Sequence, residues 1–165
     1  MNFQKIKQKI VAGISEMKIS TLCDDVLVTY SLGSCVGVTI YDPVKCIGGI
    51  IHCMLPLSKI DSKKAQDNPF MFVDIGVPLF INSLFECGVS RKNMIIKVAG
   101  GSLIMDKKGK FKIGERNYMV LRKLLWKNNM LISGEDVGGK LSRTMSLVMA
   151  TGKTFVKSDG MEKEL

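Results

Sequence analysis

The hydrophobic pattern predicts β-strands over most of the first third of the chain. Apolar and β-branched residues alternate or run together in four stretches, which are residues 10–19, 25–30, 36–41 and 46–55. Such short apolar runs are typical of strands. Between the last two runs lies the sequence Asp-Pro-Val-Lys at 42–45, in which proline pre-sets φ for a turn. We therefore expect a β-hairpin there.

The length of this turn predicts which residues face each other across the hairpin. If residues 42–45 form the loop, Tyr41 faces Cys46, and each further pair keeps the same sum of residue numbers. Cys35 then lies opposite His52, which is the one histidine of the chain. Directly opposed residues have Cβ atoms about 4.5–5.5 Å apart, so a thiol and an imidazole could interact.

The remaining two thirds of the chain predict two helices, two short strands and a closing hairpin. Residues 70–87 have apolar positions near helical spacing, although Gly76 and Pro78 either kink this helix or start a new one. Residues 118–129 predict the second helix. The expected strands are 94–98 and 131–132, and the expected hairpin pairs 144–150 with 153–156 around Thr151-Gly152.

Four polar segments complete the pattern. Residues 57–69 predict a flexible loop, which is either a lid or a surface excursion, and residues 106–112 predict a charged loop. Residues 133–141 predict a glycine-rich loop. The ends, 1–9 and 157–165, are polar or basic and we expect them to fray. The length of 165 residues fits one domain. We predict an α/β (α+β) fold, a single-domain three-layer sandwich with a mixed, largely antiparallel β-sheet and flanking helices.

Composition narrows the location and the chemistry. Five cysteines, an odd number, with one histidine and no C-x-x-C pair argue for a reduced, cytoplasmic protein without disulfides or a metal site. The apolar run at 10–14 is too short for a signal peptide or a membrane span. The net charge of +9 would suit an acidic protein, a nucleic acid or an anionic membrane surface. Because the basic residues are scattered, a solvated surface is the simpler interpretation, and we expect no nucleic-acid binding and no membrane insertion.

The residues before Cys35 favour a reactive thiol. Ser31-Leu32-Gly33-Ser34 breaks a strand pattern, and a turn at Gly33 leaves the N–H groups of Ser34 and Cys35 available as an oxyanion hole. A thiolate beside a histidine, with amides aimed at the same point, is suited to acyl transfer through a thioester. The alternative is that Cys35 is a buried apolar residue, as we expect for the other four cysteines, Cys23, Cys46, Cys53 and Cys87.

A set of short motifs surrounds Cys35 and continues through most of the chain. They are Thr29, LGSCVG at 32–37, YDP at 41–43, GG at 48–49, HCMLP at 52–56, KVAGG at 97–101, IGERN at 113–117 and DVGG at 136–139. Together they resemble the signature of the CheD family of bacterial chemoreceptor glutamine deamidases, over residues 10–156. The resemblance implies a catalytic triad of Cys35, His52 and Thr29, and an α/β sandwich with sheet between helical layers. From local sequence alone, Thr29 is simply a good strand former.

The resemblance also implies a function without a cofactor. The substrates would be glutamines on the cytoplasmic helices of methyl-accepting chemotaxis receptors, and a CheC-type phosphatase would be a partner. Gly100 and Gly101 form either a simple turn or a wall of the active site. Ser102, Ser142 and Pro78 depart from the family pattern without touching the triad. A binding module for the phosphatase or for receptors, and a thiol hydrolase or transglutaminase-like enzyme with another substrate, are the alternatives.

Overall fold

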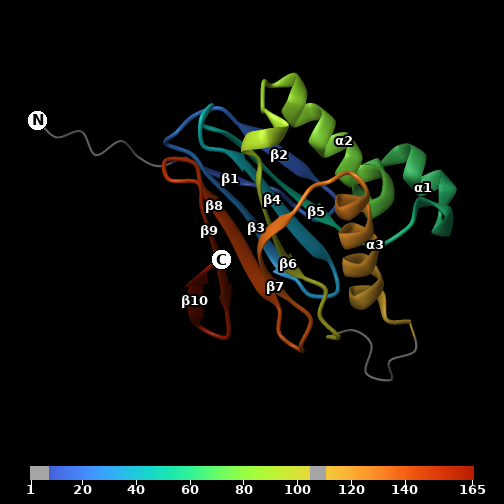
Figure 1. Cartoon of the computed structure of the whole chain (residues 1–165). Coiled ribbons are helices and arrows are strands. Elements are labelled where there is room, and N and C mark those ends of the chain that lie inside the picture. Colours follow the sequence, from blue (N-terminus) through green and yellow to red (C-terminus); the bar gives the residue numbers. More distant parts are fainter. Residues whose placement is uncertain (1–7, 105–110) are drawn as a thin grey trace, which may run out of the picture.

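Two five-stranded sheets pack face to face, and helices cover the outer face of one of them (Figure 1). The computed structural model describes residues 8–104 and 111–165. The first sheet has the order β1 (Lys9–Val11), β3 (Val26–Leu32), β8 (Arg143–Val148), β9 (Lys153–Ser158) and β10 (Met161–Glu164). The second has the order β2 (Met17–Ser20), β5 (Ile47–Cys53), β4 (Val36–Asp42), β6 (Ile95–Gly100) and β7 (Ile132–Val137). Within them the pairs β1–β3 and β6–β7 are parallel, and the other pairs are antiparallel.

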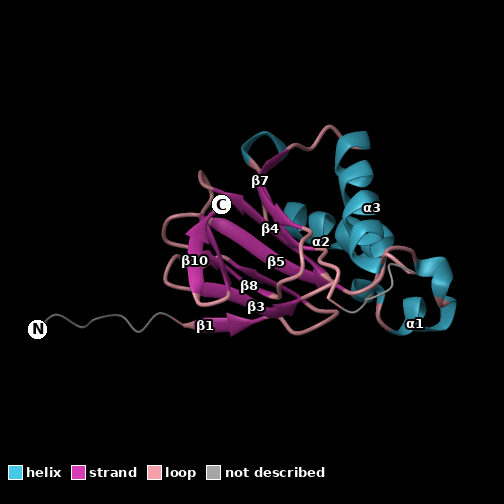
Figure 2. Cartoon of the chain, turned by 90° about the horizontal axis from the view of Figure 1, so that it is seen from below, coloured by secondary structure: helices cyan, strands magenta, loops and turns pink. Residues whose placement is uncertain are grey.

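The helices lie together on one side of the molecule, away from the first sheet (Figure 2). They are α1 (Ser62–Asp67), α2 (Val73–Glu86) and α3 (Ile113–Lys127), with 3-10 turns η1 (Ser58–Ile60), η2 (Pro69–Met71) and η3 (Arg91–Asn93). One core lies between the second sheet and α2 and α3, where Phe80 and Leu121 meet Val38. A second core lies between the sheets, where Leu27 and Met145 meet Ile50.

The predicted mixed, largely antiparallel sandwich with flanking helices is confirmed, but the order of its layers is different. The expected arrangement placed sheet between two helical layers. In the structure the second sheet is covered by helices on one face and by the first sheet on the other. The expected strand at 10–19 is therefore two strands in different sheets. The chain turns at residues 12–16, where Ser15 adopts a left-handed φ of 62°.

The hairpin forms, but its register differs by two residues from the prediction. Asp42 pairs with Ile47, and Gly37, rather than Cys35, pairs with His52. The turn comprises residues 43–46 because the Asp42 carboxylate accepts the N–H groups of Val44 and Lys45, which keeps Asp42 in the strand. A slip of two residues preserves the face of the sheet. Cys35 and His52 therefore remain on the same side, in a diagonal rather than a direct relation.

Several other boundaries also differ from the sequence prediction. α2 continues through Pro78 as one helix, and residues 57–69 contain α1 and two 3-10 turns instead of an irregular loop. β7 extends through residue 137 into the predicted glycine-rich loop. β10 replaces the expected fraying of residues 157–165 because it pairs with β9. Most of the charged loop at 106–112, and residues 1–7 of the predicted fraying end, lie outside the described residues.

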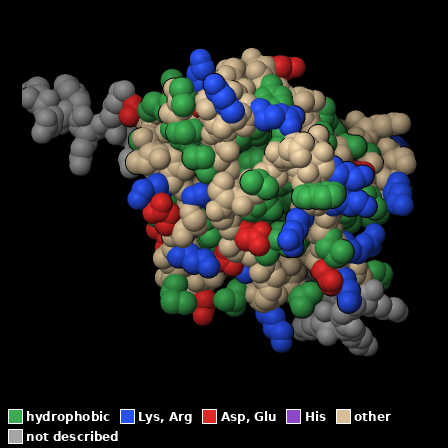
Figure 3. All heavy atoms as spheres, in the orientation of Figure 1, with side chains coloured by type: hydrophobic (Ala, Val, Ile, Leu, Met, Phe, Trp, Pro, Cys, Tyr) green, Lys and Arg blue, Asp and Glu red, His purple; other side chains and the backbone are tan. Residues whose placement is uncertain are grey.

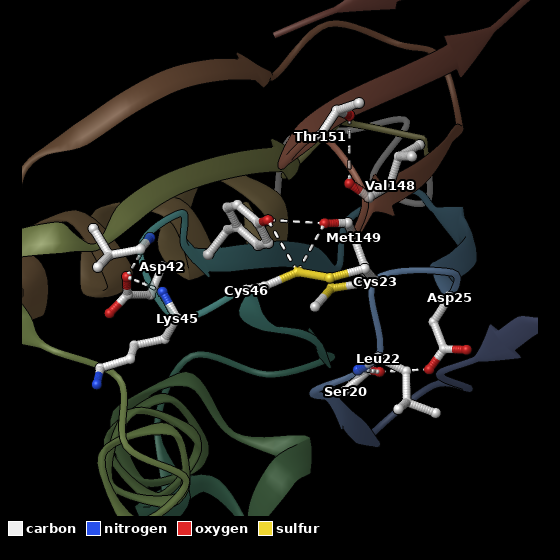
Figure 4. Close-up of a disulfide and its surroundings, with 12 residues drawn as sticks. Ser20, Leu22, Cys23, Asp25, Asp42, Lys45, Cys46, Val148, Met149 and Thr151 are labelled. Atoms are coloured by element: carbon white, nitrogen blue, oxygen red, sulfur yellow. Dashed lines mark hydrogen bonds between the residues drawn. A yellow bond between two sulfur atoms is a disulfide. The ribbon is translucent and has the colours of Figure 1, made fainter.

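Cys23 and Cys46 form a disulfide, contrary to the expectation of free thiols (Figure 4). The bond joins the loop before β3 to the turn before β5, across 23 residues of sequence. The sequence around Cys23 and Cys46 does not predict that they lie close together, because their proximity depends on β2 and β3 entering different sheets. Cys35, Cys53 and Cys87 are free, and Cys87 is exposed. Of the four cysteines predicted to be buried apolar residues, Cys53 alone is fully buried.

Charged side chains cover the surface without forming one basic patch on the face seen in Figure 3, where Lys and Arg alternate with acidic and hydrophobic side chains. This distribution agrees with the interpretation of the net charge as a solvated surface.

Candidate active site

Cys35 lies on the connection that carries the chain from the first sheet to the second. It follows β3 and precedes β4, so residues 33–35 cross between the two layers. The end of β6 holds this crossing segment: the Gly101 N–H donates to Cys35 O at 2.8 Å, and the Ser102 N–H donates to Gly33 O at 2.8 Å. A Cβ atom at Gly100 would overlap the carbonyl oxygen of Cys35. The two glycines at 100 and 101 therefore lie directly against the backbone of Cys35.

His52 and Thr29 meet across the interface between the two sheets. The Thr29 hydroxyl lies 2.8 Å from His52 Nδ1 and donates its proton to Ala12 O at 2.7 Å. Because that proton is already used, Nδ1 must carry the hydrogen of the imidazole and donate it to Thr29 Oγ1. The lone pair of the ring is therefore on Nε2, which makes no hydrogen bond within the described residues.

Burial keeps both Cys35 and His52 neutral. It raises the pKa of the Cys35 thiol to about 11, and the residue's own amide N–H opposes that shift. It lowers the pKa of His52 to about 4. The resting site at neutral pH is consequently a thiol and a neutral imidazole, and the sequence-based expectation of a thiolate beside histidine does not describe it. A neutral imidazole with a free Nε2 is the form that can accept a proton.

The backbone amides of Ser34 and Cys35 are the donors expected for an oxyanion hole. No backbone carbonyl among the described residues accepts the N–H of Ser34 or of Cys35. The Cys35 amide lowers the pKa of its own thiol, which means that it points toward the sulfur. The oxyanion hole expected from the turn at Gly33 stays a prediction.

A cavity of about 440 Å³ opens over Cys35. Gly33, Ser34 and Cys35 line one side of it. The rest is lined by Ser31, Ser142 and five apolar side chains, namely Ile14, Met54, Leu55, Ile104 and Ile113. Its size is in the range of small-molecule and side-chain binding sites. The nucleophile candidate therefore lies at the wall of a largely apolar opening.

Sequence analysis did not identify the apolar wall of this cavity. Ile14 belongs to the turn between β1 and β2, and Ile113 begins α3, so neither position has a local signal for a binding site. Ser142, noted in the sequence as a departure from the family pattern, also lines the cavity. None of residues 57–69, for which a lid was one of two alternatives, lines this cavity. The described residues contain no group of three or more His, Cys, Asp or Glu side chains arranged to hold a metal ion.

None of the described helices has the length and apolar character needed to cross a bilayer.

Comparison with known proteins places the chain in a family. The family model described as "CheD chemotactic sensory transduction" matches residues 54–158. The chain is 48% identical over 151 residues to a protein of Syntrophus aciditrophicus named "Probable chemoreceptor glutamine deamidase CheD 1", covering 92% of this chain and 94% of that one. It is 42% identical over 158 residues to "Probable chemoreceptor glutamine deamidase CheD" of Solibacter usitatus, covering 96% and 94%.

A solved structure, the hypothetical protein YfiH of Bacillus licheniformis, aligns with a TM-score of 0.47 and 15% identity over 75% of this chain and 50% of that chain. The relatives of known name span nearly the whole chain, including Thr29, Cys35 and His52, at identities well above those of chance alignments. The chain belongs to the CheD family.

Proposed function

We propose that this protein is a protein-glutamine glutaminase that converts glutamine side chains of methyl-accepting chemoreceptors to glutamate. The hydrogen bond between Thr29 and His52 Nδ1 carries the proposal, because it leaves Nε2 unprotonated on the side of the sheet where Cys35 lies. The names of the family relatives support the receptor substrate.

The first chemical step is attack of the thiol on the side-chain amide. His52 Nε2 takes the Cys35 proton as the sulfur bonds to the carbonyl carbon, and the amides of Ser34 and Cys35 bind the oxyanion. The C–N bond then breaks, and His52 returns the proton so that ammonia leaves. Cys35 and His52 are not hydrogen-bonded in this structure, a looseness that is common in sites without substrate.

The second step restores the enzyme. Water, deprotonated by His52, attacks the thioester carbon, and the C–S bond breaks. The products are a glutamate side chain and the free Cys35 thiol, so the two steps together consume one water and release one ammonia. No cofactor takes part in this scheme.

The cavity supports a helical substrate. Its apolar wall would accept the small or apolar neighbours that flank a glutamine on one face of a receptor helix, while the carboxamide reaches the sulfur. We place the protein in the cytoplasm, where the receptor signalling helices lie.

Mass spectrometry of receptor fragments tests the proposed function directly. Incubation with the protein should add about one dalton per converted glutamine, through loss of NH and gain of O. A fragment with the reactive glutamine replaced by glutamate should show no further gain. Absence of any mass change on fragments from several receptors would refute the deamidase assignment.

Substitution of Thr29 by valine should lower kcat by about tenfold to a hundredfold. Valine keeps the shape but cannot accept the Nδ1 hydrogen, so the imidazole loses the interaction that selects its tautomer. Steady-state kinetics measures the loss, and Thr29→Ser, which keeps a hydroxyl, serves as the matched control. Equal activity of the valine and serine variants would contradict the role of the hydroxyl.

The pH profile should be unusually flat. Because the pKa of His52 is lowered to about 4 and that of Cys35 is raised to about 11, the neutral pair predominates between these values. We expect kcat/KM of the free enzyme to change by less than about threefold between about pH 5 and pH 9. His52 should become protonated, and unable to act as a base, only in more acidic solution. Inflections near the ordinary values of histidine and cysteine would show that burial does not shift these groups.

A CheC-type phosphatase is a second proposed partner. In this proposal the phosphatase would occupy the surface around the cavity, so that binding and deamidation compete for one site. Inhibition of deamidation by a CheC-type protein in proportion to its binding would support that arrangement.

A further inference from the structure

We propose that Asn117 is a positioning residue that orients the oxyanion hole at Cys35 by holding the Ser34–Cys35 peptide. Asn117 lies in α3 and is completely buried. Its side-chain Nδ2 donates to Ser34 O at 2.8 Å and to Met54 O at 3.0 Å. The inference rests on the proposed acyl transfer at Cys35, for which an oxyanion hole is needed.

The two hydrogen bonds fix the orientation of the Asn117 amide. Carbonyl oxygens only accept, so Nδ2 must face Ser34 and Met54, and Oδ1 must face the other way. Oδ1 has no hydrogen-bond partner within the described residues. Asparagine inside a helix and an unpaired buried acceptor both cost free energy. The two hydrogen bonds that Nδ2 donates to Ser34 O and Met54 O offset these costs.

The bond to Ser34 O acts on the amide that faces the sulfur. Ser34 C=O and Cys35 N–H belong to one planar trans peptide, so they point in opposite directions. Holding the oxygen toward α3 turns the Cys35 N–H away from the helix, and that N–H is the group that lowers the pKa of the Cys35 thiol. Donation to the carbonyl also polarises the peptide and strengthens its N–H as a donor.

The bond to Met54 O connects the same amide to the strand of the catalytic base. Met54 follows β5 directly and lies two residues after His52, and its side chain lines the cavity. One side chain of α3 therefore holds the peptide of the nucleophile and the end of the histidine strand. The helix itself is closely seated, because a Cβ atom at Gly114 would overlap Ser102 O at the end of the segment that follows β6.

Two variants test the proposal by separating oxyanion binding from thiol reactivity. Asn117→Asp keeps the shape but loses both donors when ionised, and Asn117→Ala removes the side-chain amide. We expect both to lower kcat by about tenfold to a hundredfold with KM changed by less than about threefold. Alkylation of Cys35 by iodoacetamide forms no oxyanion, so the rate constant of its thiolate form, taken from the pH dependence of alkylation, should stay within about twofold of that of the natural protein.

Backbone NMR gives a readout that needs no substrate. Without the Asn117 donor, the Cys35 amide proton should shift upfield, because its peptide is less polarised. An unchanged Cys35 amide resonance in Asn117→Ala would overturn the inference, whatever the activity of the variant.

Thr39→Val is the matched control for stability. It removes the buried hydrogen bond between Thr39 and Thr154, 3.0 Å long, which joins the two sheets away from Cys35. It should lower the melting temperature without lowering kcat. If Asn117→Asp and Asn117→Ala lose kcat and the alkylation rate constant of the Cys35 thiolate together, Asn117 only supports the fold and the inference is wrong. The same conclusion follows if Thr39→Val loses as much kcat at the same loss of stability. Failure of the natural protein to deamidate receptor fragments would refute the proposed function, whereas normal kcat in both Asn117 variants would refute this inference alone.

Discussion

Replacement of Cys35 by serine should reduce receptor deamidation by at least about a hundredfold. Serine preserves the volume and the backbone of the crossing segment, but its hydroxyl has a far higher pKa than a thiol. One neutral imidazole, whose own pKa is lowered to about 4, is a weak base for an alcohol. The initial rate of glutamate formation, followed by mass spectrometry, measures the effect.

Cys87→Ser is the matched control, because Cys87 is a free and exposed cysteine at the end of α2 and does not line the cavity. It should have unchanged activity. Binding of Cys35→Ser to a receptor or to a CheC-type protein should persist, since one sulfur contributes little to an interface built on larger anchors. Full deamidase activity in Cys35→Ser would falsify the thioester mechanism, and a loss of partner binding with intact chemistry would assign Cys35 to an interface instead.

Substitution of Gly100 by alanine should destabilise the protein by about 3 kcal/mol or more and remove its activity. Two effects add at this position. Its φ of +106° is unfavourable for any residue with a side chain, and the new Cβ would overlap the carbonyl oxygen of Cys35. Relief of that overlap requires movement of the segment that carries the nucleophile. Urea denaturation gives the free energy of unfolding, and deamidation assays report the site.

Gly138→Ala separates the two effects. Gly138 also has a left-handed φ, of +77°, but a Cβ atom there would meet no other atom within 4 Å. Its substitution should therefore cost only about 1–2 kcal/mol, the price of the backbone conformation alone. If the two alanine variants lose the same free energy, the close approach of Gly100 to Cys35 has no energetic consequence.

Local signals predicted the turn before Cys35 and the pairing of the two strands around residues 42–46, because turn residues and alternating apolar positions act over a few residues. The register was wrong by two because the Asp42 carboxylate caps the turn from inside the strand. That error kept the correct face, and so the Cys35–His52 hypothesis remained usable.

Contacts between distant segments were not predictable in this way. The layer order depends on β1 and β2 entering different sheets, a consequence of the turn at Ser15 that the apolar run at 10–19 conceals. The close approach of Gly100 to the Cys35 carbonyl depends on the position of β6 beside Cys35, which local sequence does not predict. Asn117 lies 82 residues along the chain from that cysteine, and only packing of α3 brings it to the Ser34 carbonyl.

The hydrogen bond between Thr29 and His52 has a consequence for assembly. Thr29 belongs to the first sheet and His52 to the second, while Cys35 lies on the segment between them. A partly folded chain that contains either sheet alone therefore lacks part of the proposed triad. During refolding, deamidase activity should return only with the docking of the two sheets, after the recovery of secondary structure. The proposed active site therefore forms only in the completely folded protein, and a partly folded chain should not modify a receptor.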